Sequence, residues 1–288
     1  MKREIGRRVR VHSLAFLTTC KGRLHHLKET LPLMVAQNPD EIVVVDYDCP
    51  DGTAEWVASN YPQVTVCKVE NAPRFSPSKA RNAGARMVKS DAIFFVDADV
   101  KIVGDLVEWA GSNVRDGGFY RVSRKEEDSI RSLTGSFICL RKDFERIGGY
   151  DEAIRLYSGE DSDAYNRLKA IGVSDRKMPL ELFDSIGHAD TERVKFFSND
   201  DVERGIAVSM AYKALKYRLT EMGHDLPLCC RKLIYDEVVE RVDSRFFDIR
   251  FERKCGECGR NIRIEYRSGR RFRFFGPHTI RVKAEISR

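Results

Sequence analysis

The chain has 288 residues, of which 42% are hydrophobic and 33% charged, proportions typical of a soluble globular protein with a sizeable core. No apolar run approaches the roughly 20 residues of a transmembrane helix, which excludes a membrane-spanning protein. The N-terminus is basic but has no small-residue cleavage pattern, so we expect a cytoplasmic protein. Residues 241–288 hold 14 Lys or Arg and 6 Asp or Glu, whereas the whole chain carries +6, so the basic character belongs to the tail.

Strands and helices alternate over the first hundred residues. Strands are expected over Val9–Thr18, Asp40–Asp46, Val64–Val69 and Ala92–Val96, and helices over Leu24–Val35, Ala54–Ser59 and Ser76–Lys89. This alternation predicts an α/β fold with a mixed, mainly parallel, Rossmann-like sheet that is covered by helices on both faces.

The pattern changes after the first hundred residues. We expect helices over Leu106–Ala110 and Val202–Met222, and a further helix that begins in the acidic loop of SGEDSDAYNRLKAIG. We expect strands over Gly118–Val122, Gly135–Leu140 and Met178–Phe183. Pro227 marks the expected boundary between a domain over residues 1–226 and an appendage over residues 227–288. Short alternating runs such as NIRIEYR predict that this basic, cysteine-containing appendage is small and β-rich.

Two carboxylates, Asp97 and Asp99, follow the apolar run Ala92–Val96. Residues i and i+2 of an extended segment face the same way, so both carboxylates are expected to point into one space. Two like charges at one point favour a cation between them, and ligands of open α/β sheets bind at this end of the strands. The pair therefore indicates a metal-assisted diphosphate site, and the alternative is a solvated turn.

Five motifs occur in an order that resembles the inverting nucleotide-sugar glycosyltransferases of family 2, which have a GT-A fold. They are VVVDYDCPDGT, SKARNAGA, FVDAD, GSFICLRKDFERIGGYDE and SGEDSDAYNRL, and the resemblance runs from Val11 to Lys216. The last two also resemble the galactosyltransferase and chondroitin-polymerase branch. The tail lies outside the resemblance.

The resemblance implies residues that bind the nucleotide-sugar donor, which we expect to be linked to UDP. These residues are Thr18 and Arg23 in the loop after the first strand, Asp46, Arg81, Asn82 and Asp97. The Asp46 carboxylate can accept a hydrogen bond from a uracil imide or a ribose hydroxyl, and the Arg81 guanidinium can donate to a phosphate. The family places another Asp and a Gly where this chain has Tyr47 and Asp48, and Asp46 is also compatible with a turn or helix cap.

The resemblance also implies the metal ligands and the catalytic acids. Asp99 and a later histidine, His188, would hold Mn²⁺ or Mg²⁺, which suits oxygen ligands. Asp161 would be the general base that activates the acceptor hydroxyl, and Glu160 would bind acceptor hydroxyls. An acidic helix N-terminus is the structural alternative for Asp161, and a surface histidine is the alternative for His188.

The tail contains two features that the resemblance does not explain. RNIRIEYRSGRRFRFF interleaves Arg with aromatic residues, a pattern that binds phosphates and stacks on bases, so hydroxylated bases in DNA are an alternative to a saccharide or lipid-linked saccharide acceptor. Cys255 and Cys258 have the spacing of a zinc knuckle. Cys229 and Cys230 are adjacent, so we expect only one of them to join a structural Zn²⁺ site easily, with His278 as a further candidate.

Two other classes of protein remain as alternatives. A nucleotidyltransferase would share the sheet and the paired aspartates, but no Gly-rich, Lys-containing loop follows the first strand to hold a triphosphate. A non-catalytic sugar or nucleic-acid binding protein would keep the pocket and would not need Asp161.

Overall fold

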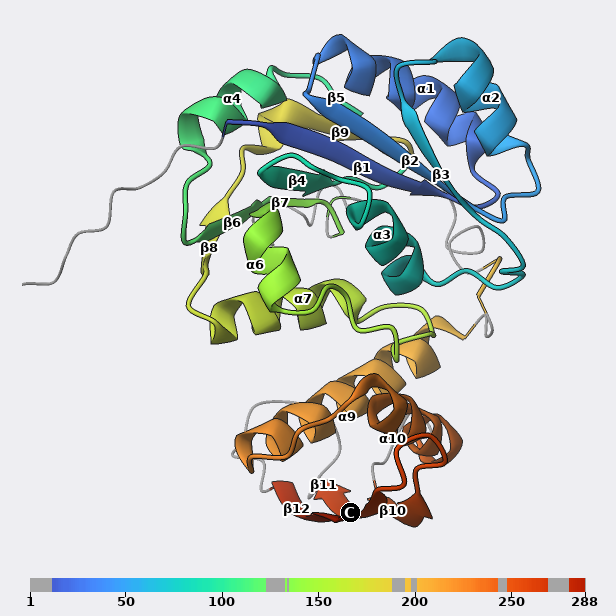
Figure 1. Ribbon diagram of the computed structural model, residues 1–288, viewed down its shortest axis with the longest axis vertical. Helices are drawn as coiled ribbons and strands as arrows, with labels where there is room; N and C mark the ends of the chain where they lie inside the picture. The colour runs from blue at the N-terminus through green and yellow to red at the C-terminus, as the bar shows by residue number, and fades with distance from the viewer. Residues whose placement is uncertain are drawn as a thin grey trace, which may run out of the picture. The chain divides into compact units, whose positions relative to one another are not determined.

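The computed structural model describes residues 12–122, 133, 135–187, 195–197, 201–242, 248–268 and 280–287. These residues divide into two compact units, one drawn from Met1–Tyr150 and Ala164–Phe196, the other from Asp151–Asp163 and Phe197–Arg288. Figure 1 labels the helices and strands of both units. No helix among the described residues has both the length and the apolar character to cross a membrane.

The first unit is built on a seven-stranded sheet with the strand order β3-β2-β1-β4-β7-β6-β8. Its strands are β1 (Leu14–Cys20), β2 (Glu41–Tyr47), β3 (Thr65–Val69), β4 (Ala92–Phe95), β6 (Gly118–Arg121), β7 (Phe137–Leu140) and β8 (Ser174–Lys177). Strands β3, β2, β1 and β4 are mutually parallel, and β7 is antiparallel to both of its neighbours. The predicted mixed, mainly parallel sheet is therefore confirmed.

Helices cover both faces of this sheet (Figure 1). Side chains of α1 (Leu24–Ala36), α2 (Thr53–Asn60) and α4 (Leu106–Asn113) share one core with Phe16 of β1. Side chains of α3 (Pro77–Ala85), α6 (Arg141–Arg146) and α7 (Glu160–Ala170) share another core with the neighbouring Leu17. Successive strand residues point to opposite faces, which is why these apolar strands need cover on both sides.

The strand predicted over Met178–Phe183 is wrong in its bounds. Strand β8 ends at Lys177, a 3₁₀ turn spans Leu180–Leu182, and β9 (Phe183–Ser185) begins only at Phe183. Pro179 immediately precedes this turn and has no backbone N–H to donate to a strand ladder. Strand β9 then pairs antiparallel with β5 (Val100–Ile102) in a separate two-stranded sheet.

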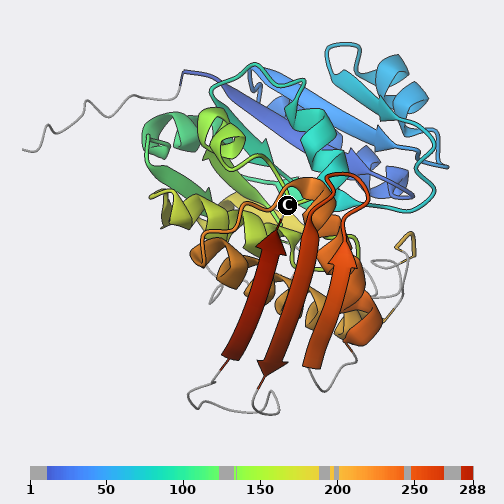
Figure 2. The same ribbon diagram turned by 60° about the horizontal axis from the view of Figure 1, so that its bottom comes forward.

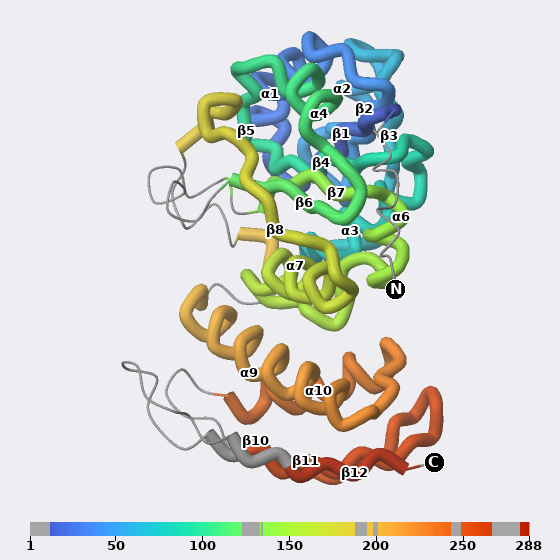
Figure 3. The backbone as a smooth tube through the Cα atoms, turned by 90° about the vertical axis from the view of Figure 1, so that its left-hand side faces the viewer, coloured from blue at the N-terminus to red at the C-terminus, as the bar shows by residue number. Residues whose placement is uncertain are grey.

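The second unit packs two helices against a three-stranded antiparallel sheet. The helices are α9 (Val202–Glu221) and α10 (Leu228–Arg241), and the strands are β10 (Asp248–Lys254), β11 (Asn261–Ser268) and β12 (Ile280–Ser287). Figure 2 shows the three strands side by side, and Figure 3 shows the helices on one side of them. The expected β-rich appendage contains this sheet, but sequence analysis did not foresee α10.

Helix α9 belongs to this unit, since its buried residues Tyr212 and Leu215 share a core with Tyr235 of α10 and Ile262 of β11. The boundary expected after residue 226 therefore falls between α9 and α10, inside the unit. The division into a catalytic domain and an appendage stays a prediction.

Candidate functional site

Asp97 and Asp99 lie in a turn rather than on the end of a strand. Strand β4 stops at Phe95, and the N–H of Val100 donates to the carbonyl of Asp97 at 3.1 Å. The hydroxyl of Thr30 donates to the carbonyl of Ala98 at 2.9 Å, which anchors the turn to α1. The expectation of an extended Asp-x-Asp segment is therefore wrong, because the strand ends before the first carboxylate.

A guanidinium faces each of the two carboxylates. Arg81 Nη2 lies 2.8 Å from Asp97 Oδ1, and Arg23 Nη1 lies 3.5 Å from Asp99 Oδ2. The Asp99 side chain is only 5% exposed, whereas that of Asp97 is 30% exposed. The turn thus combines two acids and two fixed cations at the carboxyl end of β4, the edge of an α/β sheet where ligands bind.

Helix α3 holds Arg81 firmly in place. The helix begins at Pro77 after the N-cap Ser76, whose side chain accepts a hydrogen bond from the N–H of Lys79. A Cβ at Gly84 would lie 2.6 Å from Val45 Cγ2, so only glycine permits this close approach of the helix to the sheet. The guanidinium of Arg81 lies 5.2 Å from the ring centroid of Tyr150, a cation–π contact that fixes its orientation.

Asn82 has a structural role in the described contacts. Its Nδ2 donates to the carbonyl of Tyr150 at 3.0 Å, and its Oδ1 accepts from the N–H of Tyr150 at 2.8 Å. Both ends of the amide therefore clamp the backbone that carries the Tyr150 ring under Arg81. The donor-binding role expected for Asn82 stays a prediction.

Asp46 caps the turn and helix that follow β2. Its two carboxylate oxygens accept from the N–H of Cys49 at 2.8 Å and from the N–H of Ala54 at 2.7 Å. It is 2% exposed, and Thr18 on β1 is 1% exposed. The described contacts of Asp46 thus match the helix-cap alternative, and direct nucleotide contacts of Asp46 and Thr18 stay predictions.

Lys21, in the loop after β1, is a residue that sequence analysis missed. Its buried ammonium donates to the carbonyls of Tyr47, Asp48 and Ala72 at 2.7–3.1 Å. These bonds join the loop after β1 to the turn after β2. A lysine among TTCKGRL gave no signal for this role, because its acceptors are backbone groups that only the fold brings together.

Cys49 stands beside the same loop and has an acidic thiol. Hydrogen bonding from the Cys20 thiol lowers the pKa of Cys49 to about 6, despite burial, and Thr53 and backbone N–H groups add to the effect. The two sulfur atoms are 4.0 Å apart. The sequence did not indicate this lowered pKa, because the groups that cause it lie on different elements.

The first turn of α7 carries the predicted catalytic acids, and they differ in their surroundings. Asp163 is fully buried, where it pairs with Lys216 and accepts a hydrogen bond from the Tyr217 hydroxyl at 2.8 Å. Glu160 is 8% exposed, and Asp161 is half-buried. Since Lys216 neutralises Asp163, Asp161 is the better candidate for a base in this turn.

His188 lies outside the described residues. The chain that leads to it is held against the Asp97–Asp99 turn, since the N–H of Ile186 donates to the carbonyl of Asp99 at 2.8 Å. Its predicted role as a metal ligand stays a prediction. Residues 195–197 are described, and the carbonyl of Phe196 accepts a hydrogen bond from the N–H of Phe75 at 2.8 Å.

The carboxylate oxygens of the turn Asp97–Asp99 fit a hard divalent cation. Carboxylate oxygens are the ligands that Mn²⁺ and Mg²⁺ take in proteins, and the two aspartates are joined here by a single residue. The fixed Arg23 and Arg81 offset the charge of the acids, so the pair is tolerated within the folded protein.

Two family models match the chain in the region of this turn. Residues 16–146 match the model described as glycosyl transferase family 2, and residues 122–198 match that described as the N-terminal domain of galactosyltransferase. No curated protein matches the chain in sequence.

Solved structures of low sequence identity share the fold. The mannosyltransferase PcManGT from Pyrobaculum calidifontis, in complex with GDP-Man and Mn²⁺, has a TM-score of 0.52 and 14% identity over 80% of this chain and 74% of that one. S. aureus TarS 1-349 in complex with UDP has a TM-score of 0.50 and 16% identity over 80% of this chain and 71% of that one. The complex of TarS 1-349 with UDP-GlcNAc has a TM-score of 0.50 and 16% identity over 79% of this chain and 70% of that one.

The family models contain the residues that carry the predicted resemblance. The first spans Asp46, Arg81, Asp97 and Asp99, and the second spans Glu160 and Asp161. The fold of the solved structures agrees with the sheet and helices described above. The segment 16–146 therefore belongs to glycosyl transferase family 2, and the protein is a glycosyltransferase with a GT-A fold.

Proposed function

We propose that the protein is a metal-dependent, inverting glycosyltransferase that takes a sugar from a UDP-linked donor and transfers it to a saccharide hydroxyl. The observation that carries the proposal is the turn Asp97–Asp99, with Arg81 on one carboxylate and Arg23 on the other. Because residues 16–146 match a family of enzymes, we set aside the alternative of a non-catalytic binding protein.

The turn supplies what a nucleoside diphosphate needs. Asp99 would hold the cation, with His188 as a further ligand and Asp97 as its partner on the donor side, and the bound ion would neutralise the charge that grows on the diphosphate as it leaves. Arg81 and Arg23 place two positive charges beside the phosphates, and a guanidinium can donate to two phosphate oxygens at once. The Mn²⁺ in the mannosyltransferase complex supports a divalent metal ion at this site. The UDP and UDP-GlcNAc in the TarS complexes support uridine as the nucleoside of the donor.

Asp161 is the proposed general base. The acceptor oxygen attacks the anomeric carbon while its proton passes to the Asp161 carboxylate, and the bond from that carbon to the diphosphate oxygen breaks with its electron pair on the leaving group. A single displacement of this kind inverts the anomeric configuration. Glu160 is proposed to hold acceptor hydroxyls, whereas the ion-paired Asp163 is unsuited to either role.

The second half of the run RNIRIEYRSGRRFRFF lies outside the described residues, and the strands that are described favour a saccharide over DNA as the acceptor. Arg250 is paired in register with Glu265, and Glu252 with Arg263, which is in turn opposite Glu285. Basic and acidic residues therefore alternate across the sheet, whereas a surface that follows phosphates would be basic throughout. We expect no gain in activity from DNA with hydroxymethylated bases.

The test measures release of nucleoside diphosphate from a panel of UDP-sugars and GDP-mannose with Mn²⁺, each with mixed oligosaccharides or hydroxymethylated DNA. We expect release from a UDP-sugar that increases with an oligosaccharide. Asp99→Asn should lose both this release and metal-dependent nucleotide binding. Asp161→Asn should keep nucleotide binding and lose about 10²–10⁴-fold in turnover, as expected for removal of a general base.

Asp91→Asn is the matched control, because Asp91 is an exposed aspartate at the opposite end of the same strand. It should retain full activity. No release with any donor, combined with no metal-dependent nucleotide binding, would overturn the proposal. NMR of the product's anomeric proton tests the stereochemistry, and a retained configuration would contradict the role of Asp161.

A further inference from the structure

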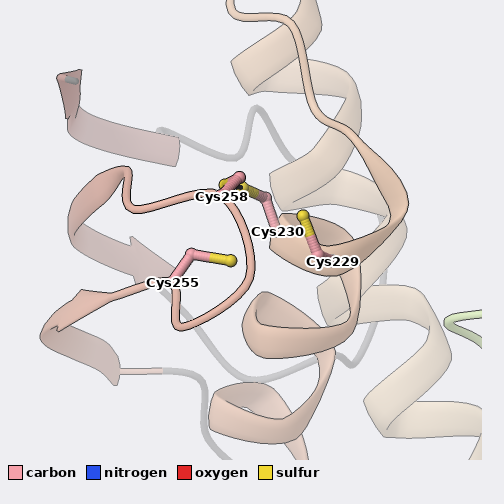
Figure 4. A group of neighbouring side chains, drawn as sticks. All are labelled: Cys229, Cys230, Cys255 and Cys258. Carbon is pink, nitrogen blue, oxygen red and sulfur yellow. Dashed lines mark hydrogen bonds between the residues drawn. The ribbon is translucent and has the colours of Figure 1, made fainter.

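Two pairs of cysteines that are distant from each other in sequence converge in the second unit (Figure 4). The sulfur atoms of Cys229, Cys230, Cys255 and Cys258 all lie within 4.8 Å of one another. Four thiolates around a tetrahedral Zn²⁺, at about 2.3 Å each, are separated by about 3.8 Å. The cluster therefore already has the dimensions of a four-cysteine zinc site.

Two of the thiols come from a zinc-knuckle loop between β10 and β11. The N–H of Cys255 donates to the carbonyl of Arg260, and the N–H of Gly259 donates to the carbonyl of Cys255, each at 2.8 Å. Gly259 has a φ of +73°, a conformation that glycine adopts without strain. The backbone N–H of Arg260 hydrogen-bonds to the Cys258 sulfur, an interaction that favours a thiolate.

The other two thiols come from the first turn of α10. Sequence analysis treated Cys229 and Cys230 as extended and expected only one to reach a shared site, but both lie inside the helix Leu228–Arg241. Adjacent helical residues diverge by about 100° rather than 180°, so both sulfur atoms can face one point. The helix N-terminus also favours negative charge.

The arrangement does not match a pair of disulfides. The shortest reported sulfur separation, between Cys230 and Cys258, is 3.3 Å, well beyond a covalent bond of about 2.05 Å. Each thiol instead has three sulfur neighbours, which is the pattern of one centre with four ligands. Carboxylates of the described residues do not belong to the cluster, so the site is soft and favours Zn²⁺ over Mn²⁺ or Mg²⁺.

A metal at this point would join the N-terminus of α10 to the loop between β10 and β11, beside the apolar core that the helix and strands already share. Arg260 already ties the loop to the segment before α10, since its guanidinium donates to the carbonyl of Asp225 at 2.6 Å. Cys230 and Cys255 are buried, whereas Cys258 is exposed. The ligands therefore extend from the core of the unit to its surface.

We infer that Cys229, Cys230, Cys255 and Cys258 bind one structural Zn²⁺ that fastens the N-terminus of α10 to the β10–β11 loop. The site serves folding of the second unit and takes no part in sugar transfer. It is independent of the proposed Mn²⁺ at Asp99, so either metal assignment can fail alone.

The first measurement is the metal content of the full chain purified without chelator. We expect about one zinc per chain, and Co²⁺ in its place should give the intense red-region absorption of a tetrahedral thiolate complex. Cys258→Ser and Cys230→Ser should lose the bound zinc and lower the Tm. Cys67→Ser removes a half-buried thiol of β3, outside the cluster, and should retain zinc and the native Tm.

Cobalt and zinc are measured on the native chain, so the test does not depend on whether a variant folds. Four titratable thiols without any metal would overturn the inference. Iron in place of zinc, or a Cys230–Cys258 disulfide found by mass spectrometry under non-reducing conditions, would also overturn it.

Discussion

Arg81 joins the proposed donor site to the core of the first unit, and its contacts predict that lysine cannot replace it. Its guanidinium bonds to Asp97 at 2.8 Å and lies 5.2 Å from the Tyr150 ring centroid. A lysine ammonium keeps the charge but loses the planar fork. A hydrogen bond to a charged group contributes about 1.5–3 kcal/mol, so we expect the KM for the donor to rise at least about tenfold in Arg81→Lys.

Arg86→Lys is the control for this substitution, because Arg86 is the exposed C-cap residue of the same helix. Steady-state kinetics with varied donor should show an unchanged KM in Arg86→Lys. An unchanged KM in Arg81→Lys would mean that the positive charge of Arg81 is sufficient and that its planar fork is not needed.

The structure brings four of the predicted site residues together, and their roles in donor and metal binding stay predictions. Arg81, Asp97, Arg23 and Asp99 form two ion pairs in the structure. The donor contact of Asn82 stays a prediction, and sequence analysis did not foresee the hydrogen bonds of its amide to the Tyr150 backbone, 68 residues away in sequence. Contacts of this kind depend on packing between distant segments, which one sequence does not display.

At the scale of elements, a buried charge network holds the helices of the second unit together. Lys216 of α9 pairs with Asp151 at 2.8 Å and with Asp163 of α7, and Arg231 of α10 pairs with Asp151 at 2.8 Å. The Tyr212 hydroxyl also donates to Asp151. Both aspartates are fully buried, so each depends on these partners to remain ionised.

Lys216→Met is expected to reduce the free energy of unfolding by about 3–5 kcal/mol at pH 7, because it leaves buried carboxylates without a cation. Burial opposes ionisation of Asp151, but Lys216 and Arg231 outweigh it and hold the pKa of Asp151 well below its ordinary value. A depressed folded-state pKa contributes stability that is present above the unfolded value of about 3.9 and is lost as pH falls towards the folded-state value.

Urea unfolding at pH 7 and at pH 3 checks both parts of this prediction. The native chain should lose stability in acid, and the difference between native chain and variant should shrink there. Lys232→Met, at a half-buried lysine of α10, is the control and should cost little at either pH. A difference that is equal at both pH values would contradict the ion-pair account.

Most elements of the first unit were predictable, because continuous apolar strands alternate with helices of regular spacing. Helix α10 was missed because the alternating runs of the tail led us to expect a β-rich appendage over all of residues 227–288, although Ile234 and Val238 have helical spacing. Strand β9 was misplaced because the apolar run Met178–Phe183 crosses from one sheet to another through Pro179. Apolar pattern alone does not show where a chain changes sheets.

At the scale of the whole molecule, the chain carries two proposed metal sites of opposite chemistry, one in each unit. The first unit offers aspartate oxygens in a turn, and the second offers four cysteine sulfurs. Hard cations on a few oxygen ligands exchange readily, whereas four thiolates retain Zn²⁺ tightly. The two metals should therefore be separable by treatment of one protein sample.

Brief dialysis against EDTA is expected to abolish sugar transfer while zinc content and Tm stay unchanged, and added Mn²⁺ should restore activity. An organomercurial that reacts with thiolates should then release zinc and lower the Tm even with Mn²⁺ present. The checks are metal analysis, calorimetry and nucleotide release on the same samples. Parallel loss of zinc and activity in EDTA would contradict the independence of the sites, and full transfer without any divalent cation would remove the role proposed for Asp99.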